Sequence, residues 1–257
     1  MKLYKYRSLE NAWNTIDIIL NRRLYLAPLE SLNDPMELKT EQVKAVIEAH
    51  LRGNGIEYSK PATEGDIAFA KSLVEQDLIS AEFIHASTGD LLLAMISRIY
   101  ARVCSLSGNP RSITMWSHYA NAHKGICLEF EINSASPIKY WEAEKFERRF
   151  SARHMRRLFA RFDAKENSTM TKLAYTVEKL KRLYSAKTYD WAYEYEWRIF
   201  RSESDRYYNF KDGEYLSRIL AGPRIDDLHH DLLTKLAPST VPIIKTSIVN
   251  GEVREAS

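Results

Sequence analysis

Two carboxylates and a guanidinium follow one another at alternate positions in the stretch YDWAYEYEWRIF (189–200). Glu194, Glu196 and Arg198 alternate there with aromatic and aliphatic side chains, a period of two that predicts a β-strand with one polar and one apolar face. Two interpretations stay open. The polar face is either a solvated surface whose acids pair with neighbouring bases, or a catalytic pair in which one carboxylate is oriented by the other and by Arg198.

A second group of chemically versatile side chains lies in MWSHYANAHKG (115–125), within a stretch that we predict to be a short helix with Ser112 as its cap and Gly125 after its end. Trp116 and Tyr119 are three residues apart and share a helix face, so they either pack in the core or form an aromatic wall of a substrate pocket. In the second case His118 or Tyr119 supplies a hydrogen bond to the ligand. His118 and His123 are five residues apart, which is poor spacing for two metal ligands on one helix, and we expect no metal site.

A candidate phosphate site lies near the N-terminus. The stretch KLYKYR (2–7) alternates like a strand, and Ser8 is placed to cap a following helix whose apolar residues recur at Leu9, Trp13, Ile16 and Leu20. Arg7 would then stand just before a helix N-terminus, where free N–H groups and the helix dipole attract anions. A surface arginine or a structural salt bridge is the alternative.

The strongest local basic patch is the run RRFSARHMRRLFAR (148–161). In a helix, Arg149 and Arg153 share a face with either Arg156 or Arg157, opposite a phenylalanine stripe. The net charge of the chain is only +3, with 28% charged residues, so a basic coat over the whole surface is not expected. The run is either a solvated face or a contact surface for nucleic acid or phosphate.

The elements that must position these residues form an α+β pattern, with a mixed or antiparallel sheet core and a largely helical insertion. We predict one domain over 1–257, with helical segments at about 40–102 and 141–187 decorating the sheet and a further helix near 226–236. The predicted strands are 2–7, 24–28, 103–108, 126–132, 189–200, 215–222 and 241–249.

Composition limits the setting in which the protein acts. The longest apolar runs, such as 91–96, are too short to cross a bilayer, and the first residues have no apolar segment typical of a secretory signal. We therefore expect a soluble, cytoplasmic protein with no membrane contact. Cys104 and Cys127 are the only cysteines, so we expect reduced, structural thiols.

Three segments in this order resemble a bacterial family known as domain of unknown function 2971: LYKYRSLENAW…RLYLAPLESLNDPME, MWSHYANAHKGICLEFE and YEYEWRIF. The resemblance covers most of the chain and implies membership of that family, but no chemistry.

The order of the predicted elements also resembles that of the ADP-ribosyltransferase superfamily, including its DNA-modifying toxin branch. This order is an Arg-bearing first strand, a helix, a second strand, a central aromatic motif and a late Glu-x-Glu strand. That similarity implies NAD as the ligand. Arg7 with Ser8 would hold the NAD, Tyr119 or Trp116 would shape the nicotinamide pocket, and Glu196 would bind the ribose. The chain departs from the superfamily in lacking a Ser-Thr-Ser motif and the usual first-strand histidine.

These patterns lead to one principal hypothesis and two alternatives. The first is an NAD-dependent ADP-ribosyltransferase-like enzyme, a bacterial toxin or phage-defence effector, in which Glu196 stabilises charge on the ribose and Glu194 orients the acceptor or accepts its proton. Arg7 would hold the pyrophosphate. The second is a non-catalytic or nuclease-associated nucleic-acid-binding module of a bacterial defence system, acting through residues 148–161. The third is a structural or interaction protein whose acidic strand is a solvated face.

Overall fold

The fold is described from a computed structural model of the chain. Its described residues are 1–10, 12–34, 44–45, 47–48, 51–52, 57, 59–75, 80–99, 101–145, 184–202 and 204–256. These residues form an α+β structure with a mixed, largely antiparallel sheet, in agreement with the expected fold class. The four arginines singled out between 148 and 161 lie outside the described residues, so nucleic-acid binding through them stays a prediction.

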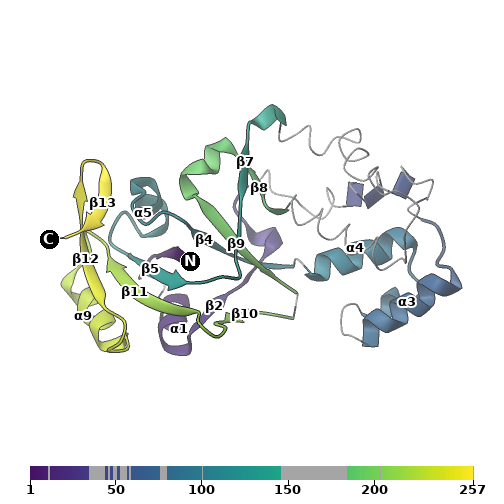
Figure 1. Cartoon of the computed structure of the whole chain (residues 1–257), viewed down its shortest axis with the longest axis horizontal. Coiled ribbons are helices and arrows are strands. Elements are labelled where there is room, and N and C mark those ends of the chain that lie inside the picture. The colour runs from purple at the N-terminus through teal and green to yellow at the C-terminus, as the bar shows by residue number, and fades with distance from the viewer. Residues whose placement is uncertain are drawn as a thin grey trace.

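The main sheet has nine strands in the described part of the chain (Figure 1), in the order β13-β12-β11-β5-β1-β4-β9-β6, with β3 also paired to β4. Its strands are β1 (Lys2–Arg7), β3 (Ala27–Pro28), β4 (Arg102–Ser107), β5 (Ile126–Glu131), β6 (Ser136–Pro137), β9 (Glu196–Arg201), β11 (Tyr215–Ala221), β12 (Ile243–Val249) and β13 (Glu252–Glu255). Two further pairs are β10 (Tyr207–Asn209) with β2 (Arg23–Tyr25), and β7 (Lys139–Trp141) with β8 (Ala186–Thr188).

The register of the central strands brings distant parts of the sequence together. Tyr4 on β1 lies opposite Ser107 on β4, and Ser107 lies opposite Glu196 on β9. On its other edge β1 pairs antiparallel with β5, from Lys2 opposite Glu131 to Arg7 opposite Ile126. The N-terminal strand is therefore central in the sheet, and only β4 separates it from the strand that carries Glu196.

Both faces of the central strands are buried, because helices cover the sheet on its two sides. One face of β1 contributes Leu3 to a core that includes Ile18 and Ile19 of α1 (Trp13–Asn21) and Leu233 of α9 (Asp227–Leu236). The other face contributes Tyr4 and Tyr6 to a core built around Trp116 of α5 (Ile113–Tyr119). The alternation of residue types in 126–132 predicts a half-buried strand, but Cys127 and Glu129 on the more polar face of β5 are 0% exposed.

Two longer helices pack together away from this core. They are α3 (Glu64–Glu75) and α4 (Thr88–Ile99), which lie at the end of the molecule opposite β12 and β13 (Figure 1). Their apolar cluster contains Ala70, Leu73, Leu91 and Met95. Short 3-10 helices complete the described elements: η1 (Leu29–Ser31), η2 (Ala81–Phe83) and η3 (Tyr189–Glu194).

The predicted strand over 189–200 is wrong in its first half. Residues Tyr189–Glu194 form η3, and Tyr195 has a left-handed backbone (φ 46°) that turns the chain into β9. Glu194 and Glu196 therefore come from different elements, not from one strand face. The helical expectation for 141–187 is also wrong at both ends, where Trp141 belongs to β7 and Lys187 to β8.

The first helix begins later than we expected and buries a different face. Its first residue is Trp13, which is 79% exposed, and its buried residues include Ile18 and Ile19. Ser8 does not cap it; the Ser8 hydroxyl accepts a hydrogen bond from the backbone N–H of Glu10. By contrast, Ser112 caps α5 as its sequence indicates, accepting from the N–H of Met115 at 3.3 Å.

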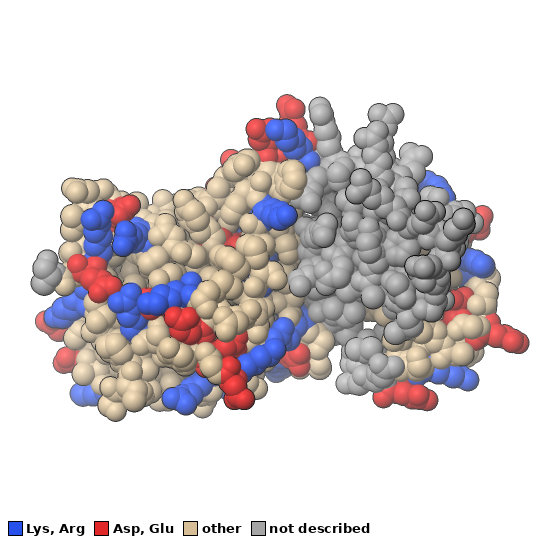
Figure 2. All heavy atoms as spheres, in the orientation of Figure 1, with Lys and Arg blue, Asp and Glu red and all other residues tan. Residues whose placement is uncertain are grey.

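The surface carries both signs of charge. Figure 2 shows Lys and Arg interspersed with Asp and Glu over the sheet end of the face in view, without a basic coat on that part. None of the described helices combines the length and the apolar character needed to cross a membrane.

Candidate functional site

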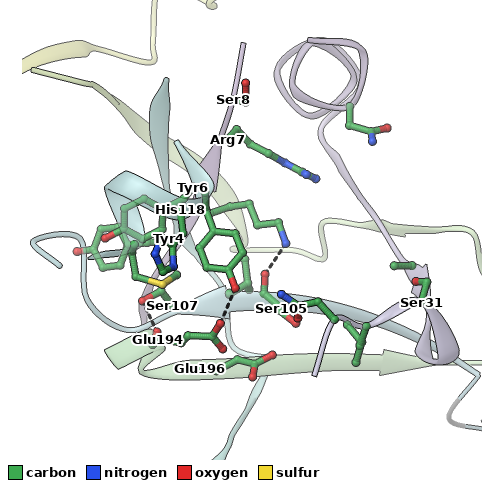
Figure 3. A pocket seen from close by; sticks show the side chains of 18 of the residues that line it. Tyr4, Tyr6, Arg7, Ser8, Ser31, Ser105, Ser107, His118, Glu194 and Glu196 are labelled. Atoms are coloured by element: carbon green, nitrogen blue, oxygen red, sulfur yellow. Dashed lines mark hydrogen bonds between the residues drawn. The ribbon is translucent and has the colours of Figure 1, made fainter. Parts of the chain in front are cut away.

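A cavity of about 550 Å³ opens between β1, β4, α5 and the chain from Lys187 to Glu196, with the segment Ser31–Asn33 forming a further wall. Its size is typical of pockets that hold small molecules. Arg7 and Ser8 lie toward one end of it, and Glu194 and Glu196 toward the other (Figure 3).

Most of the candidate residues from separate parts of the sequence meet in this cavity. Those that line it are Arg7, Ser8, His118, Tyr119, Glu194 and Glu196. Trp116 does not line it. Its ring is 0% exposed, packs edge-on against Tyr6 at a centroid distance of 5.4 Å and donates its N–H to the carbonyl of Pro110 at 2.8 Å. Of the two readings of Trp116, core packing is the one that the structure supports.

At the acidic end, Glu194 is held by two donors from different elements. The Tyr119 hydroxyl donates to Glu194 Oε1 at 2.7 Å, and the Lys187 ammonium donates to Oε2 at 2.8 Å. Glu194 and Lys187 are only 5% and 3% exposed. Burial and the bond to Glu194 raise the pKa of Tyr119, so its hydroxyl stays protonated as a donor.

Glu196 is more completely enclosed than Glu194. Arg198 donates to both of its oxygens, from Nε at 2.7 Å and from Nη2 at 3.0 Å, and Lys187 Nζ lies 3.0 Å from Oε2. Burial alone would raise the pKa of Glu196, but Arg198 and Lys187 outweigh it and hold that pKa well below its usual range. A solvated acidic face is therefore the wrong interpretation of this segment.

Lys187 joins the two carboxylates. It is the one lysine among the described cavity residues that contacts both, and burial, which lowers its pKa, is outweighed by Glu196 and Glu194, so its pKa is raised. Arg198 continues the network outward by donating from Nη1 to the carbonyl of Tyr184 at 3.1 Å. The result is a buried network of two acids and two bases, which fixes the positions of both carboxylates.

The basic end of the cavity has a different character. Lys5 donates to the backbone carbonyl of Ser105 at 2.6 Å, and no carboxylate among the described residues pairs with it. Arg7 Nε is buried and has no hydrogen-bond partner. Burial lowers the pKa of both side chains, because the charged form of each is less stable away from water.

The cavity as a whole carries a positive charge. Among its described lining residues, three cations (Lys5, Arg7 and Lys187) face two carboxylates (Glu194 and Glu196), and Arg198 lies behind Glu196 as a fourth cation. The excess charge is concentrated at Lys5 and Arg7, because Lys187 and Arg198 are paired with the acids. Such a cavity favours a ligand with an anionic part and a neutral, hydroxyl-bearing part.

The remaining candidates take more peripheral positions. Arg7 does not stand before a helix N-terminus, since α1 begins six residues later, so the predicted help from a helix dipole is absent there. His118 is exposed at the rim, with its ring 5.9 Å from that of Tyr193. No group of three or more possible metal ligands occurs in the parts of the chain that the structure describes.

Sequence reasoning missed Lys5 and Lys187 as cavity residues. Lys5 had a signal, since it shares the polar side of β1 with Arg7 at a spacing of two residues. Lys187 had no such signal in the sequence. It contacts Glu194 and Glu196 only because η3 turns the chain that follows Lys187 back toward it.

Comparison with known families supports part of the family resemblance that the sequence indicates. The model of a family described as a protein of unknown function (DUF2971) matches residues 115–199, the stretch that contains most of α5, all of β5 and η3, and the candidate acids. The match supports the family resemblance over about this third of the chain. No curated protein and no solved structure matches the chain.

Proposed function

We propose that this chain binds NAD in the cavity and breaks the bond between nicotinamide and ribose, as an ADP-ribosyltransferase-like enzyme does. One observation carries the proposal: Arg7, Tyr119 and the Glu194–Glu196 pair come from separate segments and line a single cavity. Chemical groups needed for an anionic nucleotide and for its sugar are therefore close together.

The acids suit the charge that develops during such a reaction. Cleavage of a glycosidic bond passes through an oxocarbenium-like state, and a carboxylate held near the sugar stabilises its positive charge. Glu194 is the better candidate for this role, because one of its oxygens is engaged by the Tyr119 hydroxyl, which a sugar hydroxyl can replace. Both oxygens of Glu196 are occupied by Arg198 and Lys187, so Glu196 serves to hold Lys187 in place.

The basic end suits the phosphates of the same ligand. The Arg7 side chain lines the cavity, and the buried Nε without a partner is a donor available to a phosphate oxygen. A ligand that spans the cavity would place its anionic part at Arg7 and its sugar near Glu194. The ribose carbon that loses nicotinamide forms a new bond to water or to a nucleophilic group of another molecule, with release of one proton. Such an enzyme depletes NAD or modifies that molecule, and a toxin or phage-defence role would use either outcome.

The test is nicotinamide release from NAD by the full chain, with and without DNA, RNA and cell extract. We expect release by the wild type, a fall of at least about 100-fold in Glu194→Gln and a smaller fall in Tyr119→Phe, which keeps the ring but removes the hydroxyl. NAD binding measured by calorimetry should be retained in Glu194→Gln, because its phosphate contacts are unchanged.

The matched control is Glu214→Gln. Glu214 is another buried carboxylate, but it does not line the cavity. Its replacement should lower stability and leave nicotinamide release per folded molecule unchanged. Failure of the wild type to release nicotinamide under every condition, together with failure to bind NAD, would refute the proposal.

A further inference from the structure

Lys5 and Arg7 are two cations on the same face of β1, and neither forms an ion pair with an acid among the described residues. Both line the cavity. Every other cation of the cavity network is paired: Lys187 contacts Glu194 and Glu196, and Arg198 contacts Glu196. Glu196 attracts Lys5 only from beyond ion-pair distance, so Lys5 and Arg7 are the cations of the site that lack a direct acidic contact among the described residues.

Burying an unpaired cation is unfavourable unless another group compensates its charge and completes its hydrogen bonds. The Lys5 ammonium has three donors; one is used on the carbonyl of Ser105, and the Cys104 thiol is a second neighbour. The Arg7 guanidinium has five donors and forms no hydrogen bond with the described residues. The two side chains together leave enough donors for several anionic oxygens.

The spacing of the two cations indicates the shape of the anion. Residues two apart on a strand face the same side and have Cα atoms about 7 Å apart, given a rise of about 3.3–3.4 Å per residue. Two long side chains from such positions can each bind a separate phosphate of one ligand. The neighbouring lining residues Ser8, Asn14 and Asn33 add neutral polar groups to the same region.

We propose that Lys5 and Arg7 form a subsite for two linked phosphates, so that the cavity selects phosphoanhydrides such as nucleoside diphosphates and dinucleotides over monophosphates. The proposal rests on the proposed function only in taking this cavity as the ligand site, and it holds for any phosphoanhydride whether or not a glycosidic bond is broken. Lys5 is a specificity-determining residue in this arrangement, because Arg7 alone can bind one phosphate.

The acids at the other end give the subsite a direction. Lys187 and Arg198 are already paired with Glu194 and Glu196, so this end attracts phosphate oxygens less than Lys5 and Arg7 do, while Glu194 can accept hydrogen bonds from sugar hydroxyls. The phosphoanhydride is therefore placed at Lys5 and Arg7, and the sugar that it carries points toward Tyr119 and Glu194.

The experiment is calorimetric titration of the full chain with inorganic pyrophosphate and with inorganic phosphate. We expect pyrophosphate to bind at least about tenfold more tightly than phosphate, because it reaches both cations. Lys5→Gln should weaken pyrophosphate binding by about 10-fold or more and remove most of the preference over phosphate. Arg7→Gln should weaken the binding of both anions.

Lys2→Gln is the matched control, since it removes one positive charge from the same strand outside the cavity. The Lys2 side chain is 55% exposed and pairs with Glu129. It should leave both affinities within about twofold, because exposed charges are screened by salt. Lys5→Arg keeps the charge and serves if Lys5→Gln does not fold; it should retain the preference for pyrophosphate.

Equal affinity for the two anions, or an equal loss in Lys2→Gln and Lys5→Gln, would overturn the subsite. Pyrophosphate binding that depends on Lys5, without nicotinamide release, supports the subsite and refutes the glycosidic chemistry. Nicotinamide release without any preference for pyrophosphate supports the glycosidic chemistry and refutes the subsite.

Discussion

The Lys187 ammonium donates a 2.8 Å hydrogen bond to Glu194. Lys187 lies on β8, which comes directly before η3, and Glu194 is the last residue of η3. Both side chains are buried, and the same ammonium contacts Glu196. This bridge sets the separation of the two acids in the cavity.

Removal of the Lys187 charge should be strongly destabilising. Lys187→Met leaves Glu194 and Glu196 buried with one base fewer, and breaking a buried ion pair from one side costs about 3–5 kcal/mol. Chemical denaturation should show this loss. Lys187→Arg, which keeps the charge, should lose less. A loss below about 1 kcal/mol in Lys187→Met would show that the bridge contributes little to the fold.

Glu196→Gln should reduce stability as well as any activity. The change leaves Arg198 and Lys187 with one negative charge fewer in a buried site, so we expect a loss of about 3 kcal/mol or more. Glu131→Gln, at a partly exposed position of β5, should change stability by less than about 1 kcal/mol and is the control. Unchanged thermal unfolding of Glu196→Gln would contradict the network described here.

Gly125→Ala should disturb the basic end of the cavity from behind. A Cβ at Gly125 would lie 2.1 Å from the carbonyl oxygen of Arg7, so the end of β1 must move. We expect a loss of stability of about 1–3 kcal/mol together with weaker pyrophosphate binding. Gly65→Ala is the control, because its Cβ meets no atom closer than 3.8 Å and alanine favours the helix. Equal pyrophosphate affinity in Gly125→Ala and the wild type would show that β1 tolerates the change.

Stability should fall in acid because of Glu214. Its buried carboxylate accepts from the Tyr208 hydroxyl, from the N–H groups of Asn133 and Lys211, and from Ser134. Burial raises the pKa of Glu214, but these bonds outweigh it and lower that pKa to about 2. The contribution is therefore present above the unfolded-state pKa of about 4.3 and is lost as the pH falls toward 2.

Urea unfolding between pH 3 and pH 6 measures this dependence, those limits bracketing about 4.3. Glu214→Gln should be less stable at pH 6 and should show a shallower decline toward pH 3 than the wild type. Parallel pH profiles for the two proteins would contradict the assignment.

Patterns local in sequence predicted the elements that local chemistry determines. The alternation in Lys2–Arg7 and Ile126–Glu131 gave two central strands, and the cap at Ser112 gave the start of α5. The same alternation wrongly predicted a strand before Glu196. Residues 189–194 form a 3-10 helix that ends at the left-handed backbone of Tyr195, and period-two spacing does not reveal such a turn.

The site could be predicted only in part for the same reason. Arg7, Tyr119 and Glu194 were identified from their residue types and neighbours, and tertiary structure brings them into one cavity. Trp116 was a candidate because an aromatic side chain on a short helix can face a pocket or the core, and only packing distinguishes the two. The role of Lys187 depends on contacts across a turn, which no periodicity records.

The most direct test of the central claim is the release of nicotinamide when the purified wild-type chain is incubated with NAD. We expect release that saturates with NAD, is competed by pyrophosphate and is lost in Glu194→Gln. No release, combined with no detectable NAD binding by the same preparation, would contradict it and leave the acidic network as a purely structural feature.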